Sequence, residues 1–441
     1  MSHDAQSSPR VGFLAAWDRL VGARWSPVMP RRRGRKPRVP LAELMPALTY
    51  HVMQGAGTLA EHSATLFADT LADSSWADRR ARLPWEIFAD LMRRVLRPQA
   101  TRRHREAFWR GWRLVALDGT TFSLTNTPQM PGSIRKARTR RGLAAFANMT
   151  TAVLLEVGLH NPLAAAIGRA GESEWVLGQR LLAQLPTRAL LLGDRLYGVA
   201  AFALHARAAC ARVGSHFLLR ASRSTHPRVR QRLRDGTRLI AVAVRSRQRP
   251  ATILEWLEVR EIRVRVGRRG HRTHELRLWT SLFDPRTAPA LELAQLYAQR
   301  WEHELYFREL KRQVRRTDVL QSHTVGTAAQ EIAALVLVSA VLATERARAA
   351  GGHMPVLHIS FSKLLERCVK PMWFYLDVAH GVLTEPQIRT IMRRSYARAR
   401  TYVVAPRRAR SCPRAVRQPI QAWPRMLKPS STYGAMAFQL V

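Results

Sequence analysis

Four polar side chains with complementary chemistry lie at regular intervals in the stretch Leu291 to Gln313. The stretch contains no Gly or Pro and consists of good helix formers, which predicts a single helix. At about 100° per residue, Arg300, Glu304 and Lys311 fall within about 60° of Tyr297 on the helical wheel. A carboxylate flanked by two cations and a phenol suits a metal ion beside a phosphodiester. A solvated helix face with ion pairs, such as Arg300 with Glu304, explains the same spacing.

Two aspartates that follow short apolar segments extend this candidate site. Asp118 comes after Leu114–Leu117, and Asp194 ends the apolar run that begins at Arg188. Acids are scarce in this chain, with 31 Asp and Glu against 72 Lys and Arg. Carboxylates hold Mg²⁺ or Mn²⁺ while leaving positions for water and substrate phosphate, and two such ions support displacement at phosphorus. Taken alone, each Asp also fits a turn or a structural ion pair.

Strand-like segments surround these two aspartates and predict an α/β fold. They are 114–117, 145–158, 162–169, 188–194 and 216–222. Ser173–Leu185 has the pattern of an amphipathic helix between them. In α/β sheets, polar residues at strand ends collect at one edge, where sites form. The segment 223–281 instead alternates apolar and polar residues, which predicts an antiparallel β insertion.

The predicted organisation is an α/β core that is interrupted by this insertion and flanked by helical regions. The boundaries are 1–40 (basic N-terminal arm), 41–110 (helical N-terminal DNA-binding domain), 111–222 (first part of the core), 223–285 (β insertion), 286–350 (second part of the core) and 351–441 (helical C-terminal region with a basic tail). A plain helical packing domain remains an alternative for 41–110.

The net charge of +41 over 441 residues indicates a polyanionic partner. Nucleic acid is the natural one, and its binding should weaken steeply with salt. A ribosome-like protein shares this composition, whereas a membrane-surface protein would concentrate its charge in one amphipathic helix. The arm at Arg31–Arg38 could lie in a DNA minor groove or act as a solvated linker. Its candidate DNA contacts are Arg31, Arg33, Arg35 and Lys36.

Location signals are weak and favour the cytoplasm. The N-terminal ten residues have no apolar core, so we expect no secretory signal. The longest apolar run, Ile332 to Ala343, is too short to span a bilayer and predicts a buried core helix. Cys210, Cys368 and Cys412 lie far apart without metal-binding spacing, which fits a reducing compartment. We therefore expect no membrane partner.

Three blocks of the sequence resemble the bacterial insertion-sequence transposases of family 4. The blocks are Asp118–Gly119–Thr120, Gly193–Asp194–Arg195 and the signature Tyr-x2-Arg-x3-Glu-x6-Lys, which Tyr297, Arg300, Glu304 and Lys311 satisfy at every interval. The resemblance covers the chain from about residue 40 to the tail. It implies an RNase H-like core with a DDE triad, and it accounts for a β-strand insertion between the second and third acids.

The resemblance also implies roles for the site residues. Asp118, Asp194 and Glu304 would be catalytic and would bind two divalent ions, Mg²⁺ or Mn²⁺. Tyr297, Arg300 and Lys311 would hold DNA phosphates near the cleaved end. In relatives that form DNA hairpins, a Trp that lies four residues before a Thr stacks on a flipped base. That position before Thr280 is Leu276, so Trp279 and Trp256 are the candidates for base stacking, although a core role suits them better.

The function implied is that of an insertion-sequence transposase in the bacterial cytoplasm, associated with the nucleoid. It would bind the terminal inverted repeats of its element, hydrolyse phosphodiester bonds there and transfer the 3′-hydroxyl ends into target DNA. A homodimer is expected in the synaptic complex. Two alternatives stay open: a metal-dependent nuclease with the same core that cuts without joining, and a catalytically inactive DNA-binding remnant. The helix at 291–313 is also expected to pack Trp301 against the core.

Overall fold

The computed structural model describes most of the chain between residues 10 and 404 together with a short C-terminal strand. The described residues are 10–22, 25, 39–67, 71–127, 134, 136–139, 142–222, 225–246, 248–249, 251–267, 274–315, 317–404 and 437–440. The predicted DNA contacts of the basic arm, Arg31, Arg33, Arg35 and Lys36, lie outside them, as does most of the basic tail.

The chain forms two compact units. Unit 1 comprises Met1–Arg110, Asp118–Gln184 and Glu302–Val404, and unit 2 comprises Gly111–Leu117, Leu185–Trp301 and Ala405–Val441. Strand β2 (Trp112–Ser123) belongs to both, because its first part lies in unit 2 and its second part in unit 1. The fold is mixed α/β, with a large sheet and many helices, as the sequence predicts.

Unit 1 is built mainly from helices. Those before β2 are α1 (Gly12–Val21), α2 (Leu41–His51), α3 (Leu59–Leu66), α4 (Asp73–Ala81) and α5 (Trp85–Val95), followed by η1 (Arg105–Ala107) and β1 (Phe108–Trp109). The later ones are α10 (Val325–Ala350), η5 (Val356–His358), α11 (Phe361–Leu364), the π segment η6 (Leu365–Val369), α12 (Lys370–Val378) and α13 (Glu385–Thr401).

Helix α10 is the centre of unit 1. A capping box between Thr324 and Thr327 starts it, and Gly351 ends it in the left-handed conformation. It is apolar nearly all round, and α2, α5 and α13 pack against it. By length and composition α10 could cross a membrane, but 83% of its most apolar window is buried inside the protein. This burial is what a core helix requires.

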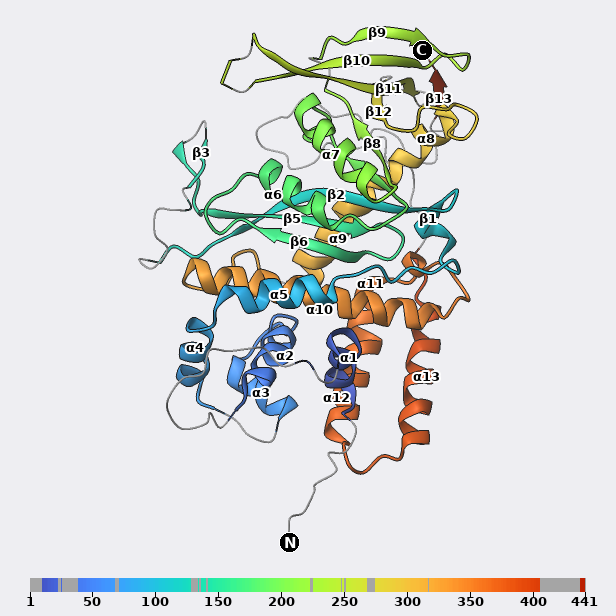
Figure 1. The fold of residues 1–441 in the computed structure, drawn as a ribbon. Helices are drawn as coiled ribbons and strands as arrows, with labels where there is room; N and C mark the ends of the chain where they lie inside the picture. The colour runs from blue at the N-terminus through green and yellow to red at the C-terminus, as the bar shows by residue number, and fades with distance from the viewer. Residues whose placement is uncertain are drawn as a thin grey trace, which may run out of the picture. The chain divides into compact units, whose positions relative to one another are not determined.

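Two strands of unit 1 lie on one side of α10. They are β5 (Asn148–Glu156) and β6 (Asn161–Ile167), which pair antiparallel, and the strand order is β6-β5-β2. A short ribbon of β3 (Arg138–Thr139) and β4 (Gly142–Leu143), then α6 (Glu174–Leu181) and η2 (Leu182–Gln184), complete this part. Figure 1 shows α5 and α10 beneath β5 and β6, and α10 contacts β6.

Unit 2 joins parallel strands to an antiparallel extension. Strands β7 (Ala189–Gly193) and β8 (His216–Arg220) are parallel to β2, with α7 (Ala200–Arg212) between them. The order continues β8-β12-β11-β10-β9, all antiparallel, where the strands are β9 (Arg228–Arg232), β10 (Arg238–Arg245), β11 (Ile253–Gly267) and β12 (His274–Thr280). The terminal β13 (Ala437–Leu440) pairs with β11, and α8 (Ala290–Tyr297) packs there (Figure 1).

Candidate active site

Asp118 lies inside a strand rather than after one. The apolar run Leu114–Leu117 is buried, as predicted, but β2 continues to Ser123. Pairing of β2 with β7 ends at Leu117, whose register partner is Gly193, so Asp118 is the first residue beyond that pairing. Its carboxylate accepts the Gly119 backbone N–H at 2.9 Å. The prediction of a strand end at Leu117 is thus wrong, because β2 continues on the side of β5.

An acidic side chain approaches the backbone of Gly119, next to Asp118. A Cβ atom built on Gly119 would lie 2.4 Å from the side chain of Glu174. Glu174 occupies the first turn of α6, whose N-cap is Ser173. The sequence reading missed this acid, because only the fold of unit 1 brings α6 to β2.

Asp194 directly follows β7, whose five residues are all buried. Its carboxylate accepts the Leu196 N–H at 2.7 Å, and its carbonyl accepts the N–H groups of Tyr197 and Gly198. These bonds form a tight turn between β7 and α7, and they hold a partly exposed carboxylate at the end of a buried strand.

The stretch predicted as a single helix is a chain of four helical segments. After α8, a 3₁₀ turn, η3 (Ala298–Arg300), leads into α9 (Trp301–Arg308), which becomes a π-helix, η4 (Glu309–Arg315). A wheel at 100° per residue therefore does not describe the whole stretch, since 3₁₀ and π segments turn by different angles. Propensity alone favours an uninterrupted helix, which the chain does not form here.

Tyr297 and Arg300 both belong to unit 2. Tyr297 is buried, and its hydroxyl donates to the carbonyl of Gly193 at 3.2 Å, next to Asp194. While this bond is present, the hydroxyl has no proton left to donate to a phosphate, and its direct effect is to steady the end of β7. Arg300 is partly exposed on the 3₁₀ turn.

Lys311 lies on the π segment of unit 1 and faces β2. Its Nζ donates to the carbonyl of Thr121 at 2.6 Å and lies 5.0 Å from the centre of the Phe122 ring. Burial, and then the nearby Arg315 charge, lower the Lys311 pKa to about 8. An ammonium carries three donors, so one bond to Thr121 leaves two for a phosphate.

Two tryptophans differ in exposure. Trp279 on β12 is fully buried, so stacking on a base would require it to leave the core. Trp301, by contrast, is 45% exposed, and the expectation that it packs against the core is wrong. It lies where the 3₁₀ turn passes into α9, and the buried residues of α9 are His303, Leu305, Tyr306 and Phe307 instead.

The predicted acids divide between the two units, with Asp118 and Glu304 in unit 1 and Asp194 in unit 2. Within the described part of the chain, no three His, Cys, Asp or Glu side chains form a ready metal-binding group. The donor chemistry nevertheless fits divalent ions, since three carboxylates supply the hard oxygens that Mg²⁺ and Mn²⁺ prefer. Mg²⁺ sites of this class rely on one or two carboxylates and complete their coordination with substrate phosphates.

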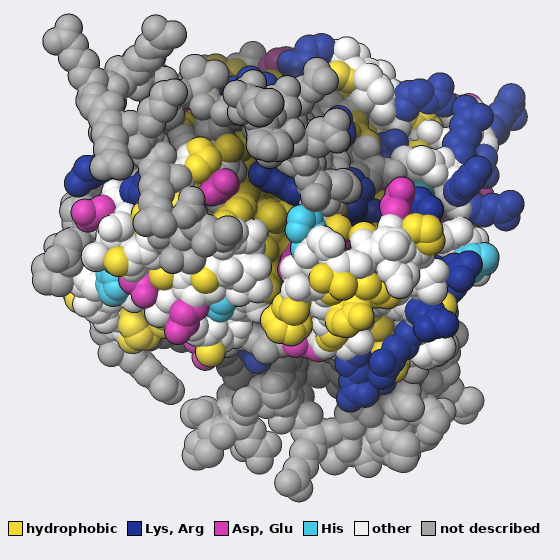
Figure 2. All heavy atoms as spheres, turned by 90° about the horizontal axis from the view of Figure 1, so that it is seen from below, with side chains coloured by type: hydrophobic (Ala, Val, Ile, Leu, Met, Phe, Trp, Pro, Cys, Tyr) yellow, Lys and Arg dark blue, Asp and Glu magenta, His cyan; other side chains and the backbone are white. Residues whose placement is uncertain are grey.

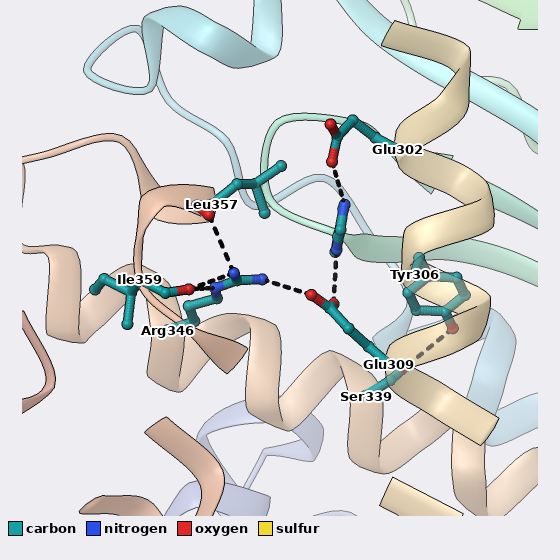
Figure 3. A network of polar contacts seen from close by, with 8 residues as sticks. Glu302, Tyr306, Glu309, Ser339, Arg346, Leu357 and Ile359 are labelled. Carbon is teal, nitrogen blue, oxygen red and sulfur yellow. Dashed lines mark hydrogen bonds and ion pairs between the residues drawn. The ribbon is translucent and has the colours of Figure 1, made fainter. Parts of the chain in front are cut away.

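The sequence did not predict the buried ionic cluster that involves α9 and η4 (Figure 3). His160, in the turn between β5 and β6, contacts both Glu302 and Glu309, and Glu309 also contacts Arg346. Glu302 and Glu309 lie 142 and 149 positions after His160 in the sequence. The available signal was the seven-residue interval between Glu302 and Glu309, which is two helical turns.

Comparison with known proteins gives a consistent picture. The family model of the transposase DDE domain matches residues 109–341. The transposase InsG for insertion sequence element IS4 of Escherichia coli (strain K12) is 24% identical over 330 residues, which are 74% of this chain and 72% of the relative. InsZ of the same organism is 28% identical over 130 residues, 29% of this chain and 43% of that one.

Among solved structures, a similar chain comes from the piggyBac transposase synaptic complex with hairpin DNA. The TM-score is 0.45 at 9% sequence identity, and the match covers 88% of this chain and 86% of the other.

Proposed function

The chain belongs to the DDE-domain transposases of the insertion-sequence 4 family, and we propose that it binds the ends of its element, cuts them and joins the freed 3′-hydroxyl ends to target DNA. The observation that carries this proposal is the register of two parallel strands. Leu117 of β2 pairs with Gly193 of β7, and the next residue of each chain segment is an aspartate, Asp118 and Asp194.

The strand order supports an RNase H-like core for this activity. Unit 1 has the order β6-β5-β2, and unit 2 has β2-β7-β8 with parallel pairing. This is the order expected of such a core, with the β9–β12 segment inserted after β8. The carboxyl ends of parallel strands are where sites of α/β sheets form.

We assign the three carboxylates of Asp118, Asp194 and Glu304 to the binding of two divalent ions. Transposases with a DDE domain generally use such ions, and when bound they would activate the attacking oxygen and stabilise the leaving oxygen. Asp118 and Asp194 are already oriented by the backbone N–H groups of Gly119 and Leu196. Preorganised carboxylates avoid the cost of reorientation when DNA arrives.

DNA is the polyanion that suits the charge of a transposase chain. The net charge is +41, and on the face drawn in Figure 2 Lys and Arg gather along one side while Asp and Glu are scattered. Arg300 and Lys311 would hold phosphates near the cleaved bond, and Tyr297 would do so after release from Gly193. A homodimer would bring two element ends together for joining.

Replacement of Asp118 by Asn tests the proposed chemistry. The amide keeps the size of the side chain but removes the charge that a metal ligand needs, so we expect end cleavage to fall by about 10²- to 10³-fold, as for the loss of one preorganised electrostatic group. Asp90→Asn is the matched control, because Asp90 lies on the surface in ion pairs with Arg93 and Arg94. DNA affinity, measured by a mobility shift, should be similar for both variants.

Full cleavage by Asp118→Asn would reject the assignment. A second assay supplies ends that already carry a 3′-hydroxyl and measures their joining to a plasmid. Joined products distinguish a transposase from a nuclease that only cuts, whereas the absence of cleavage and joining in the wild-type chain would indicate an inactive DNA-binding remnant.

A further inference from the structure

His160 occupies an unusual place in unit 1. It closes the turn between β5 and β6 with a φ of 54°, a left-handed conformation that favours glycine or asparagine over histidine. Its side chain is 3% exposed. A residue that bears backbone strain in a buried turn is expected to contribute a side chain that the simpler residues lack.

Both ring nitrogens of His160 meet carboxylates on the helix that carries Glu304. Nδ1 lies 2.7 Å from Glu309 and Nε2 lies 3.0 Å from Glu302 (Figure 3). With both carboxylates ionised, each can only accept, so both ring nitrogens donate and the ring is an imidazolium. The raised pKa of His160, which results from these carboxylates against the opposing effect of burial, agrees with this state.

The charges around the imidazolium alternate in sign and extend to a second helix, α10. Arg346 of α10 donates to Glu309 at 3.3 Å, and it also donates to the carbonyls of Leu357 and Ile359. Glu302, His160, Glu309 and Arg346 therefore form a chain of alternating sign, whose desolvation is offset by pairing at every step. The cluster fixes the helix to the β5–β6 turn and to α10.

The position of the two glutamates relates this cluster to Glu304. Glu302 lies in α9 and Glu309 is the first residue of the π segment, so His160 spans the change from α to π geometry. Glu304 is two residues after Glu302, which places it about 200° around the helix, on the opposite side. A clamp on one side of the helix limits the roll and tilt of the other.

We propose that His160 is a positioning residue, which clamps Glu302 and Glu309 so that Glu304 is held in the direction that metal binding and cleavage require. This inference rests on the proposed function of Glu304. The π segment agrees with it, because π geometry inside a helix is uncommon and is often found at functional sites.

Two substitutions at the partly exposed Glu302 separate a clamp from simple core stability. Glu302→Ala removes one of the two carboxylates that contact His160, whereas Glu302→Gln keeps an oxygen that accepts the Nε2 proton. We expect the Ala variant to slow single-turnover end cleavage by about 10- to 100-fold, the usual effect of losing a group that orients a metal ligand, while the Gln variant retains most of the rate. His160→Asn tolerates the left-handed backbone and should behave like Glu302→Ala.

Tyr306→Phe is the control for a lost hydrogen bond on the same helix. Its hydroxyl bonds Ser339 at 3.0 Å outside the clamp, so the variant should cut at the wild-type rate. Rate constant and amplitude are recorded separately, because a destabilised fold lowers the amplitude and mispositioning lowers the rate constant. A second readout needs no turnover: the affinity for Mn²⁺, measured by electron paramagnetic resonance, should weaken about tenfold in Glu302→Ala and His160→Asn.

The outcomes distinguish this inference from the proposed function. If the wild type cuts and Asp118→Asn does not, the transposase chemistry stands, and a wild-type rate and Mn²⁺ affinity in Glu302→Ala would overturn the clamp alone. A loss of amplitude without a change in rate constant would also overturn it. If His160→Asn does not fold, the comparison of Glu302→Ala with Glu302→Gln tests the clamp. If the wild type neither cuts nor binds Mn²⁺, both proposals fall together.

Discussion

Lys311 is a cation that loses its charge at a pH only slightly above neutral. It donates to Thr121 and lies against the Phe122 ring, and burial lowers its pKa to about 8. A lysine binds phosphate only in its protonated form, so its contribution to DNA binding is present below this pKa and is lost as the pH rises through about 8. A bound phosphate would raise the pKa and shift the loss to higher pH.

We therefore predict that the affinity for an element end falls between pH 7 and pH 9.5. In the Lys311→Arg variant this fall in affinity should be smaller by a factor of about three to ten, the range for one partly exposed charge-assisted bond. An arginine stays charged throughout. Lys363→Arg, at an exposed lysine of α11, is the control and should leave the pH dependence as it is. Fluorescence anisotropy at constant ionic strength measures the effect. Equal pH profiles for Lys311→Arg and the wild type would contradict it.

At the scale of single residues, the sequence identifies groups that follow a local signal. Asp194 after a buried apolar run could be located in this way, and so could the intervals of the Tyr297–Lys311 signature. His160 could not, because its partners are distant in the sequence and a turn histidine has no pattern of its own. Glu174 near Gly119 was missed for the same reason. Contacts between remote segments depend on packing rather than on periodicity.

At the scale of elements, a partly buried carboxyl group lies where α1 contacts α12. Asp377 accepts the Phe13 N–H at the start of α1, and burial raises the Asp377 pKa to about 7. Gly12 is required there, because it has a φ of 57° and a Cβ atom would lie 2.0 Å from the Asp377 carboxyl. The folded state thus keeps a proton on Asp377 that the unfolded state releases above its ordinary value near 3.8.

The sign of the pH effect follows from this difference. Between pH 3.8 and about 7 the folded state binds more protons than the unfolded state, so the Asp377 contribution to stability falls as the pH rises through this window. We predict that Asp377→Asn abolishes this component and makes the protein more stable than the wild type at pH 8, by about 1–3 kcal/mol. Urea unfolding of both proteins at pH 5 and pH 8 measures it. Asp90→Asn is the control, because ion pairs with arginine lower the Asp90 pKa and no stabilisation at pH 8 is expected.

Helix boundaries show where sequence patterns stop being informative. The apolar run at 332–343 correctly predicted a buried helix, and α10 extends beyond it at both ends because its flanks have helix formers and a capping box. The stretch at 291–313 looked equally regular, yet it contains a 3₁₀ turn and a π segment. Wheel angles assume constant geometry, and the contacts of Glu309 and Lys311 that accompany the π segment come from other elements.

At the scale of the whole molecule, the α/β class was accessible from the sequence but the strand order was not. Alternation at 223–281 predicts strands, and these residues form β9 to β12. That β12 rather than β9 pairs with β8 depends on the register Leu278 with Arg220, which no periodicity encodes. The order matters for function, because it makes Leu117 and Gly193 neighbours just before the two aspartates.

The charge of the chain leads to a prediction that distinguishes direct phosphate contacts of the basic arm from long-range attraction by the charge of the whole chain. If the proposed contacts of the arm, Arg31, Arg33, Arg35 and Lys36, each neutralise a phosphate, changing all four to Gln should lower the slope of log affinity against log salt by about 3 to 4 units, at about 0.9 per phosphate. The matched control removes four exposed arginines of α13, Arg389, Arg393, Arg394 and Arg398. Both variants have the same net charge, so a long-range field alone would change their slopes equally. A larger effect of the arm variant is expected, and equal slopes would reject the arm as a DNA contact.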